Sequence, residues 1–483
     1  MPSSLSFEER EQEQDTESSR ERFLLPNFQE AEDVEKYAPG GFHPVHLGDV
    51  YDGGRYRVAR RLGAGGFATV WLARDEREER WVALKIVVAE HSVSVGEKSR
   101  RVAEKLLPDA DGSKVTAAEL RRFTIDGPNG RHLCLVLPVL GPSASRLSSG
   151  FTSRLKPWLA RRVGYQVAKA VAAMHAQGLC HGDVTTSNIL FTLNDIEEAD
   201  IDRLFGPPVK DELKTESGEA IGPEAPRYIV KALDFLLSSS NIISNDVMLI
   251  DFDQLFPTSS PPNKMLGTPP EYLAPEVAAG LPASPASDVW ALGCCIFRLR
   301  SGEGPFTNYE VTSPADLIKI VIQTLGDIPP EWQDTLWDYD GQPTKDPRKG
   351  RPISKWEGER PMKDLVYRIW DQPEGNIVQT GTTRPEWKVW DDDENKPFPD
   401  CFSDMVWKPT AVKVDNVFLF GYNDGSDALL EAMPKIAERE AALLYDLLSK
   451  IFIYDPEKRP TASEVLAHPW LHMDEPAGLD GEV

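Results

Sequence analysis

Three runs rich in β-branched and aromatic residues, separated by turns, constrain the fold of this sequence most strongly. Tyr56–Leu62 leads into a glycine-rich turn, and Thr69–Ala73 follows that turn. A charged turn, Asp75–Arg80, then precedes a third run, Trp81–Val88. Runs of this kind joined by turns are typical of strands paired in hairpins. The sequence therefore predicts a small antiparallel sheet in this region.

The rest of the chain changes from a strand pattern to a helix pattern near residue 140. A helix is predicted over 97–107 and a further strand over 132–137, which completes a small β-rich lobe. Lys156–Gln177 then carries apolar residues at helical spacing, and Gly178 is placed to end that helix. Two more helices are predicted over 287–299 and 436–452.

These patterns indicate an α+β fold with a small β-rich lobe and a larger, mainly helical lobe. The Glu-, Gln- and Ser-rich start is expected to be disordered, and the aromatic-containing stretch after it to be an ordered extension. Stretches rich in Pro, Trp and charge are interpreted as insertions in the larger lobe. The expected parts are a tail over 1–22, an extension over 23–55, the small lobe over 56–140, the large lobe over 141–473 with insertions near 192–245 and 303–435, and a tail over 474–483.

Composition narrows the classes of partner. The net charge of −24 disfavours direct binding to nucleic acid or anionic membranes and favours basic partners, although it also fits a solubility charge spread over exposed faces. The five cysteines are odd in number and form no Cys-x-x-Cys, which indicates buried thiols in a reducing compartment. No signal peptide pattern and no long apolar run is present. We expect a monomer in the cytoplasm, the nucleus or both.

Two features of the β-rich lobe suit phosphate binding. The segment Leu62–Val70 places glycines in a turn between two strands, where backbone N–H groups can approach phosphates without obstruction by Cβ atoms. Glycine-rich hairpins also occur in many other folds. Lys85 lies in an apolar strand and is costly to bury unless paired, and Glu104 on the following helix is a possible partner. An edge-strand lysine that extends to water is the alternative.

Two features of the larger lobe suit proton acceptance and metal binding. Asp183 and Asn188 lie in one loop after the long helix, where the carboxylate can accept a hydroxyl proton and the amide oxygen can bind Mg²⁺. Asp251 follows the apolar run Val247–Ile250, and a carboxylate at a strand end suits a hard cation. A loop rich in Asx turns and an aspartate that caps the next turn are the structural alternatives. All these parts in one sequence supply what phosphoryl transfer requires.

These motifs resemble those of the eukaryotic protein kinases over about Tyr56–Leu471. The resemblance implies ATP and Mg²⁺ as cofactors, Asp183 and Lys85 as catalytic residues, and Asn188 and Asp251 as metal ligands. Gly267–Glu276 is similar to the end of an activation segment, Asp288–Gly293 to the helix F motif of that family, and Arg459 to the arginine that pairs with Glu276. The implied nucleotide site comprises Leu62, Gly63, Ala64, Gly65, Gly66, Phe67, Val70, Ala83, Lys85, Glu104 and Leu190.

A narrower resemblance points to the serine/arginine-rich protein kinase branch. It rests on Gly40–Val45, Gly48-Asp49, Arg55-Tyr56, Ala68–Ala73, His132–Gly141 and Ser301–Phe306. The resemblance implies a serine/threonine kinase that acts on protein segments rich in Arg and Ser. An acidic protein suits such a basic substrate electrostatically.

Three residues depart from the protein kinase pattern. Gly182 replaces the usual arginine before the catalytic aspartate, so we expect activity that does not depend on phosphorylation of the activation segment. Thr185 replaces a lysine that stabilises the transferring phosphoryl group, and Lys264 could take over that charge. Asp253 replaces a glycine, and its side chain should restrict a backbone flip of the segment.

The departures keep two alternatives open. The pattern His-Gly-Asp with Asp-Phe-Asp also resembles small-molecule kinases of the aminoglycoside and choline phosphotransferase type. The Ala-Pro-Glu segment at 274–276 and the motif around Asp288 favour a protein kinase instead. The second alternative is a pseudokinase or scaffold that binds ATP weakly or not at all.

Overall fold

The computed structural model describes residues 21–28, 31–105, 116, 119–148, 154–194, 196, 200–238, 242–371, 405–407, 412–414, 417–419 and 434–473. The chain divides into two units. The first unit contains the residues up to Glu97 together with Glu119–Val139 and Ile196–Asp234. The second unit contains Lys98–Ala118, Leu140–Asp195 and the chain from Phe235 onward.

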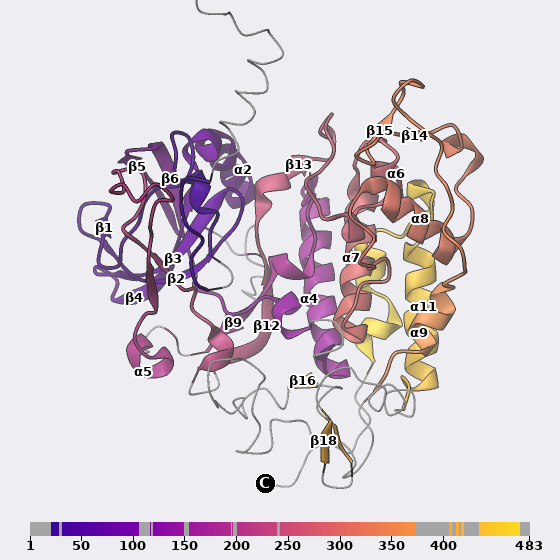
Figure 1. The fold of residues 1–483 in the computed structure, drawn as a ribbon. Helices are drawn as coiled ribbons and strands as arrows, with labels where there is room; N and C mark the ends of the chain where they lie inside the picture. The colour runs from indigo at the N-terminus through magenta and orange to yellow at the C-terminus, as the bar shows by residue number, and fades with distance from the viewer. Residues whose placement is uncertain are drawn as a thin grey trace, which may run out of the picture. The chain divides into compact units, whose positions relative to one another are not determined.

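A six-stranded antiparallel sheet, labelled in Figure 1, forms most of the first unit. Its strand order is β1-β2-β3-β4-β6-β5. The three predicted strand runs, which start at Tyr56, Thr69 and Trp81, form β2, β3 and β4, so the predicted hairpins are present. The sequence did not predict β5, whose charged residues hide the strand pattern. The strands are β1 Val50–Tyr51, β2 Tyr56–Ala64, β3 Ala68–Asp75, β4 Arg80–Val87, β5 Arg121–Gly127 and β6 Gly130–Leu137.

The two faces of the sheet have different roles. Trp71, Val82, Leu84 and Val136 belong to one buried hydrophobic cluster. Because successive side chains in a strand point to opposite faces, their neighbours Val70, Ala83 and Lys85 lie on the other face. Lys85 pairs directly with Val70 on one side and with Leu135 on the other. The core on the first face therefore fixes the register of the residues predicted to contact a nucleotide.

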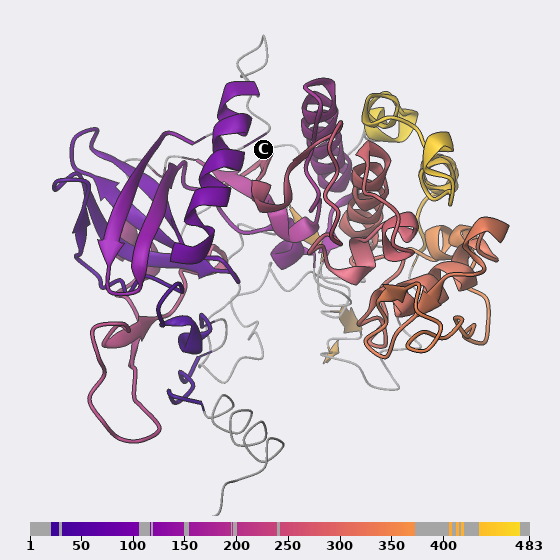
Figure 2. The same ribbon diagram turned by 90° about the horizontal axis from the view of Figure 1, so that it is seen from above.

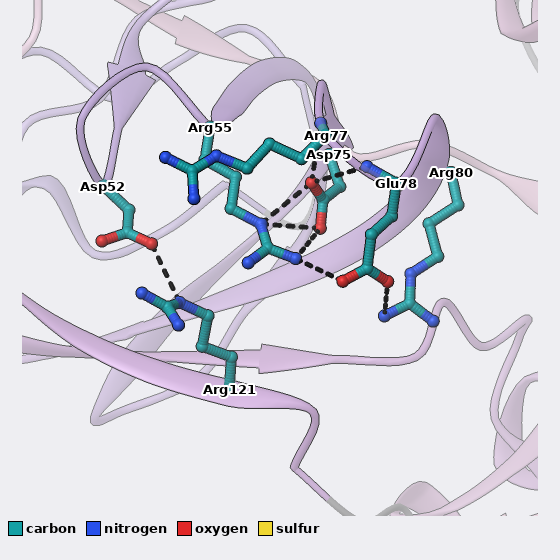
Figure 3. Close-up of polar contacts among 7 residues, drawn as sticks. All are labelled: Asp52, Arg55, Asp75, Arg77, Glu78, Arg80 and Arg121. Atoms are coloured by element: carbon teal, nitrogen blue, oxygen red, sulfur yellow. Dashed lines mark hydrogen bonds and ion pairs between the residues drawn. The ribbon is translucent and has the colours of Figure 1, made fainter.

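Ion pairs stabilise the charged turn between β3 and β4 (Figure 3). Arg55 donates to the buried Asp75 carboxylate at 2.8 Å and to Glu78 at 2.5 Å. The backbone N–H of Arg77 also donates to Asp75, at 3.1 Å. Burial alone would raise the pKa of Asp75, but these hydrogen bonds hold it below its usual value. Arg80 completes the network by pairing with Glu78 at 2.7 Å.

Two segments outside the sheet pack together on the first unit. The N-terminal extension buries Tyr37 and Phe42 in a hydrophobic cluster that also contains Leu213 and Ile229 of the segment 196–234. The sequence placed that segment as an insertion in the larger lobe, whereas its contacts group it with the first unit. The segment contains α5 Ile201–Phe205 and the strand pair β10 Lys210–Glu212 with β11 Tyr228–Val230.

Helix α2, Ser92–Lys105, starts earlier than the predicted helix over 97–107. Serines and Gly96 weaken the helix signal of its first turns. Gly96 lies close to the sheet, because a Cβ at this position would be 3.3 Å from Leu133 Cδ2. Val95 of α2 packs with Val87, Leu133 and Leu135 of the sheet. Figure 2 shows α2 beside these strands.

The second unit is mainly helical. The predicted helix that ends before Gly178 is α4, Pro157–Ala176, and Gly178 adopts the expected left-handed conformation with φ +69°. Trp290 of α7 stacks on Phe306 at 5.1 Å between ring centroids and also contacts Phe452. The other helices are α3 Ala144–Leu147, α6 Pro275–Ala278, α7 Pro285–Ser301, α8 Pro314–Leu325, α9 Met362–Tyr367, α11 Glu438–Ile451 and α12 Ala462–Leu466.

Short two-stranded sheets connect the loops of the second unit. The pair β9 with β12 carries the predicted metal ligands at one end. The strands are β7 Arg154–Leu155, β8 Leu179–Cys180, β9 Ile189–Leu193, β12 Ile243–Leu249, β13 Phe256–Pro257, β14 Leu336–Trp337, β15 Pro343–Thr344, β16 Val406–Trp407, β17 Val412–Val414 and β18 Val417–Leu419.

Some of the sequence predictions fall on residues outside those that the structure describes. The tails over 1–20 and 474–483 lie outside them, as does Cys401. The other cysteines, Cys134, Cys180, Cys294 and Cys295, are buried free thiols, as predicted. Among the described helices, none combines the length and apolar composition needed to cross a membrane.

Candidate active site

A buried carboxylate of α7 holds the start of the loop His181–Asn188 in place. Asp288 accepts hydrogen bonds from the backbone N–H of His181 at 2.8 Å and of Gly182 at 2.9 Å. His175 at the end of α4 lies 2.9 Å from the same carboxylate. Burial alone would raise the pKa of Asp288, but its hydrogen bonds and the nearby histidines hold it below its usual value. The ionised carboxylate therefore sets the backbone path into the loop.

Gly182 meets a steric requirement of this loop. Its φ is +79°, and a Cβ at this position would lie 2.6 Å from the carbonyl oxygen of Gln254. Only glycine fits both conditions, because an L-residue is strained at this φ and the Cβ would clash with backbone. The Gly182 carbonyl accepts a hydrogen bond from the buried Thr268 hydroxyl at 2.7 Å. The loop is thus tied directly to the segment 267–276.

Asp183 and Asn188 face each other across the loop. Asn188 Nδ2 donates to the Asp183 carboxylate at 2.8 Å and to the Asp183 carbonyl at 2.9 Å. Asp183 Oδ1 is buried without a hydrogen-bond partner among the described residues. Burial raises the pKa of Asp183 to about 6, with a further increase from the charge of Asp251 and an opposing effect of Asn188. A carboxylate with this pKa can accept a proton near neutral pH.

Asp251 comes to the same place because β9 and β12 are antiparallel. Asn188 directly precedes β9, Asp251 follows β12, and Ile189 pairs with Leu249. The Ile250 N–H donates to the Asn188 carbonyl at 2.9 Å, which extends this pairing to the site. Asp251 itself has a φ of +66°. The structure therefore brings together the three predicted polar residues of the larger lobe.

The segment after Asp251 is held by two contacts. The Phe252 ring lies 5.4 Å from the ring of His181, between centroids. The ammonium group of Lys98 on α2 donates to the carbonyl oxygen of Asp253. Burial lowers the pKa of Lys98. No local sequence pattern indicates this lysine, because the contact joins positions far apart in the chain.

The predicted nucleotide residues of the first unit lie along β2, β3 and β4. Gly63 pairs with Val70 and Ala64 with Thr69, so Leu62–Phe67 forms the end and turn of one hairpin. Cβ atoms on Gly63 and Gly65 would meet no atom of the described residues within 4 Å. The glycine-rich turn therefore has open space around its backbone, as a phosphate-covering turn requires.

Leu190 and Glu104 belong to the second unit and were also predicted for the nucleotide site. Leu190 lies on β9, where it pairs with Met248. Glu104 lies near the end of α2 with an exposed side chain. The pairing of Lys85 with Glu104 stays a prediction.

A buried ion pair joins α6 to a distant part of the second unit. Arg459 donates to Glu276 through two nitrogen atoms, at 2.7 and 2.6 Å. Ser287 donates to the same carboxylate at 3.0 Å. The Arg459 guanidinium also lies 4.9 Å from the centroid of the Trp290 ring. The pair predicted from the sequence is therefore present and joins α6 to the chain after α11.

Comparison with known proteins places this geometry in a family. Protein kinase dsk1 of Schizosaccharomyces pombe is 36% identical over 169 residues, which cover 34% of this chain and 31% of that protein. Human SRSF protein kinase 3 is 35% identical over 35% of this chain and 30% of its own length. The serine/threonine-protein kinase SRPK of Physarum polycephalum is 28% identical over 62% of this chain and 73% of that protein. The chain thus spans less than a third of the first two relatives.

The family assignment rests on a longer match than any of these relatives provides. The model of the protein kinase domain matches residues 56–202 and 230–471. The gap between the two matched stretches falls inside the segment 196–234 that packs on the first unit. The matched stretches cover most of the chain and contain the loop His181–Asn188, Asp251 and the Glu276–Arg459 pair, and they show that this chain belongs to the protein kinase family.

Proposed function

We propose that this chain is a serine/threonine kinase that uses ATP and Mg²⁺ to phosphorylate proteins. The observation that carries the proposal is the convergence of Asp183, Asn188 and Asp251 at one end of the β9–β12 pair. Several relatives are named serine/threonine-protein kinases, which supports the choice of acceptor.

Asp183 is the proton acceptor in this proposal. Its pKa of about 6 leaves the carboxylate ionised at neutral pH and still basic enough to take a proton from a hydroxyl. As the new bond forms between the acceptor oxygen and the γ-phosphorus, the bond to ADP breaks and the hydroxyl proton passes to Asp183. Asn188 holds the carboxylate in place by its hydrogen bond of 2.8 Å.

Asn188 and Asp251 fit the role of Mg²⁺ ligands. Because Asn188 Nδ2 is engaged by two oxygens of Asp183, its Oδ1 is left as an acceptor. Amide and carboxylate oxygens are the donors that Mg²⁺ prefers. The negative charge of Asp251 raises the pKa of Asp183, which shows that the two carboxylates repel each other. When bound, Mg²⁺ would neutralise charge on the transferring phosphates.

Lys85 is assigned to the α- and β-phosphates by its place in the family motif. It extends from the face of the sheet opposite the hydrophobic core, together with Val70 and Ala83. Leu62, Val70, Ala83 and Leu190 are proposed to contact the adenine ring. Thr185, buried in the loop, does not supply the positive charge that a lysine would bring there.

The proposed substrates are protein segments rich in Arg and Ser. A net charge of −24 favours association with basic segments through long-range attraction. The similarity to relatives named SRSF protein kinase 3 and SRPK points in the same direction.

A transfer assay tests the proposal. Radiolabelled ATP and Mg²⁺ are offered with an Arg-Ser repeat peptide, a Lys-Ser repeat peptide of equal length, and choline. Label on the Arg-Ser peptide in preference to the other two supports the proposal. Transfer to choline alone would reject a protein kinase, and ATP-dependent thermal stabilisation without transfer to any acceptor would indicate a pseudokinase.

A further inference from the structure

The tip of the glycine-rich turn is held by a lysine from the N-terminal extension. Lys36 Nζ donates to the carbonyl oxygen of Gly66 at 3.0 Å. A Cβ built on Gly66 would lie 3.8 Å from Lys36 Nζ, and no atom of the described residues lies within 4 Å of a Cβ built on Gly63 or Gly65. The Lys36 ammonium therefore approaches the turn at Gly66.

The backbone of Lys36 is well fixed. It ends the short 3₁₀ helix Val34–Lys36, which the Asp33 side chain caps. The Lys36 carbonyl accepts hydrogen bonds from the backbone N–H groups of Phe42 at 2.8 Å and Ala38 at 2.9 Å. Its ammonium also lies 5.9 Å from the centroid of the Phe42 ring. The backbone from which the side chain extends to Gly66 is therefore fixed.

The extension is in turn anchored to the strand that leads into the glycine-rich turn. Glu32 forms an ion pair with Arg61 of β2 at 2.9 Å, and both side chains are 1% exposed. The Tyr37 hydroxyl donates to Glu32 at 2.9 Å, and Arg61 also donates to the Val230 carbonyl at 3.2 Å. A buried, hydrogen-bonded pair of this kind holds the extension in a defined position relative to β2.

The orientation of one peptide group links this contact to phosphate binding. In a planar trans peptide, the C=O and the N–H point in opposite directions. Lys36 holds the Gly66 carbonyl on its own side, so the N–H of Phe67 in the same peptide is directed to the opposite side. The Phe67 carbonyl is fixed as well, because it accepts from the Val88 N–H at 2.9 Å. The peptide at the tip of the turn is thereby held in one orientation before any nucleotide arrives.

We propose that Lys36 is a positioning residue for the nucleotide phosphates, acting through the Gly66–Phe67 peptide. The inference rests on the proposed ATP-dependent function and adds a role for the N-terminal extension in it. Without the lysine, the glycines of the turn allow the peptide to rotate, and the ordering cost is then met during ATP binding. The expected consequence is weaker ATP binding with little change in the transfer step.

The test compares Lys36→Met, which keeps the aliphatic stem, with Lys36→Arg, which keeps a charged donor. Lys210→Met is the matched control, because Lys210 is an exposed lysine of the same unit whose ammonium lies 4.6 Å from the Tyr228 ring centroid. Lys36→Met should raise the KM for ATP by about three- to tenfold, the range for loss of one hydrogen bond, with kcat and the KM for peptide unchanged. Lys36→Arg should restore most of the loss, and Lys210→Met should match the original protein.

A second measurement separates this inference from the proposed function. Hydrogen exchange without nucleotide should be faster at residues 63–68 in Lys36→Met than in Lys210→Met, at equal melting temperature. Failure of the unmodified protein to bind ATP would reject the proposed function, while the exchange result would still decide the contact. An unchanged exchange rate together with an unchanged KM for ATP in Lys36→Met would overturn the role of Lys36. Equal effects of Lys36→Met and Lys210→Met would overturn it as well.

Discussion

Asn188 Nδ2 donates to the carboxylate of Asp183 at 2.8 Å, so the proposed metal ligand also orients the proposed base. The same nitrogen donates to the Asp183 carbonyl at 2.9 Å, which closes the loop on itself. Asp183 and Asn188 are therefore expected to act as one unit, in which a change at either residue disturbs both proton acceptance and metal binding.

The substitution Asp183→Asn should remove phosphoryl transfer and leave ATP binding intact. An amide of the same shape cannot accept the hydroxyl proton, and loss of a general base typically costs about 10²–10⁴-fold in rate. Transfer to an Arg-Ser peptide and ATP-induced thermal stabilisation measure the two properties. Ser187→Ala is the control, because this neighbour is exposed and its hydroxyl lies 3.2 Å from Ser145 Oγ, away from the carboxylate of Asp183. Near-normal turnover by Asp183→Asn would contradict the assignment.

The pH dependence of transfer should show an acid limb set by Asp183. Burial raises the pKa of this carboxyl to about 6, and only the ionised form can accept the proton. The value of kcat/KM should therefore fall by half at about pH 6 and by about tenfold one unit lower. A profile of kcat/KM between pH 5 and 8 measures this limb. A flat profile down to pH 5 would show that proton transfer to Asp183 does not limit the rate.

Substituting Gly182 by alanine should lower the free energy of unfolding by more than the strain of a positive φ alone. The Cβ would lie 2.6 Å from the Gln254 carbonyl oxygen, so both the φ of +79° and a backbone clash oppose it. Gly218 is a matched control, since its φ is +75° and its Cβ would meet nothing within 4 Å. Gly218→Ala should cost about 1–2 kcal/mol in unfolding free energy, the strain of a left-handed residue.

Gly182→Ala should exceed that cost and also lower kcat, because Thr268 and Asp288 bind the backbone of Gly182. Chemical denaturation and the transfer assay measure the two effects. Equal losses of stability in the two variants would show that Gln254 moves away without cost.

The sequence predicted the parts of the site better than the contacts that organise them. Asp183, Asn188 and Asp251 were found from local patterns, and the antiparallel pairing of β9 with β12 brings them together as expected. The sequence indicates Asp288 only as part of a helix motif, and the structure shows that it holds the N–H groups of His181 and Gly182. That role depends on a contact between α7 and a distant loop, which no local pattern of residues can show.

The same holds for the fold: local composition predicts some strands, but it does not predict contacts between distant parts of the chain. The strands β2, β3 and β4 follow from their composition, whereas β5 was missed because Arg121, Arg122 and Asp126 mask its alternation. The position of the segment 196–234 with the first unit depends on contacts such as the ion pair of Arg60 with Asp202 and the hydrogen bond from Arg61 to the Val230 carbonyl. Partners so far apart in sequence cannot be matched from charge alone.

The first unit should lose stability in acid because of His43. This side chain is 8% exposed, and its ring lies 5.0 Å from that of His132 and 5.9 Å from that of Tyr51. Burial, with smaller effects of His132 and His46, lowers the pKa of His43 to about 4. The unfolded chain takes up the proton near pH 6.5, so stability present above that pH is lost as the pH falls towards 4. The loss should reach about 3 kcal/mol.

Urea denaturation of the original protein and of His43→Leu between pH 7 and 4.5 measures this contribution. The variant should be less dependent on pH in this range, even if its stability at pH 7 is lower. His91→Leu serves as the control, because His91 lies on the surface beside Phe67 and Glu90. Parallel curves for the original protein and His43→Leu would assign the acid loss to other groups.

The Asp251–Asp253 segment should resist the backbone flip that some kinase inhibitors require. Two constraints oppose the flip: Asp253 lacks the freedom of glycine, and Lys98 of α2 donates to its carbonyl oxygen. Compounds that need the flipped segment should therefore bind more weakly than compounds that do not.

Asp253→Gly should raise the affinity of the first class by about tenfold, equivalent to about 1.4 kcal/mol, and leave the second class unchanged. Lys98→Met should act in the same direction because it removes the other constraint. Isothermal titration with one compound of each class measures both effects, and equal affinity for the two classes in the original protein would show that the segment flips freely.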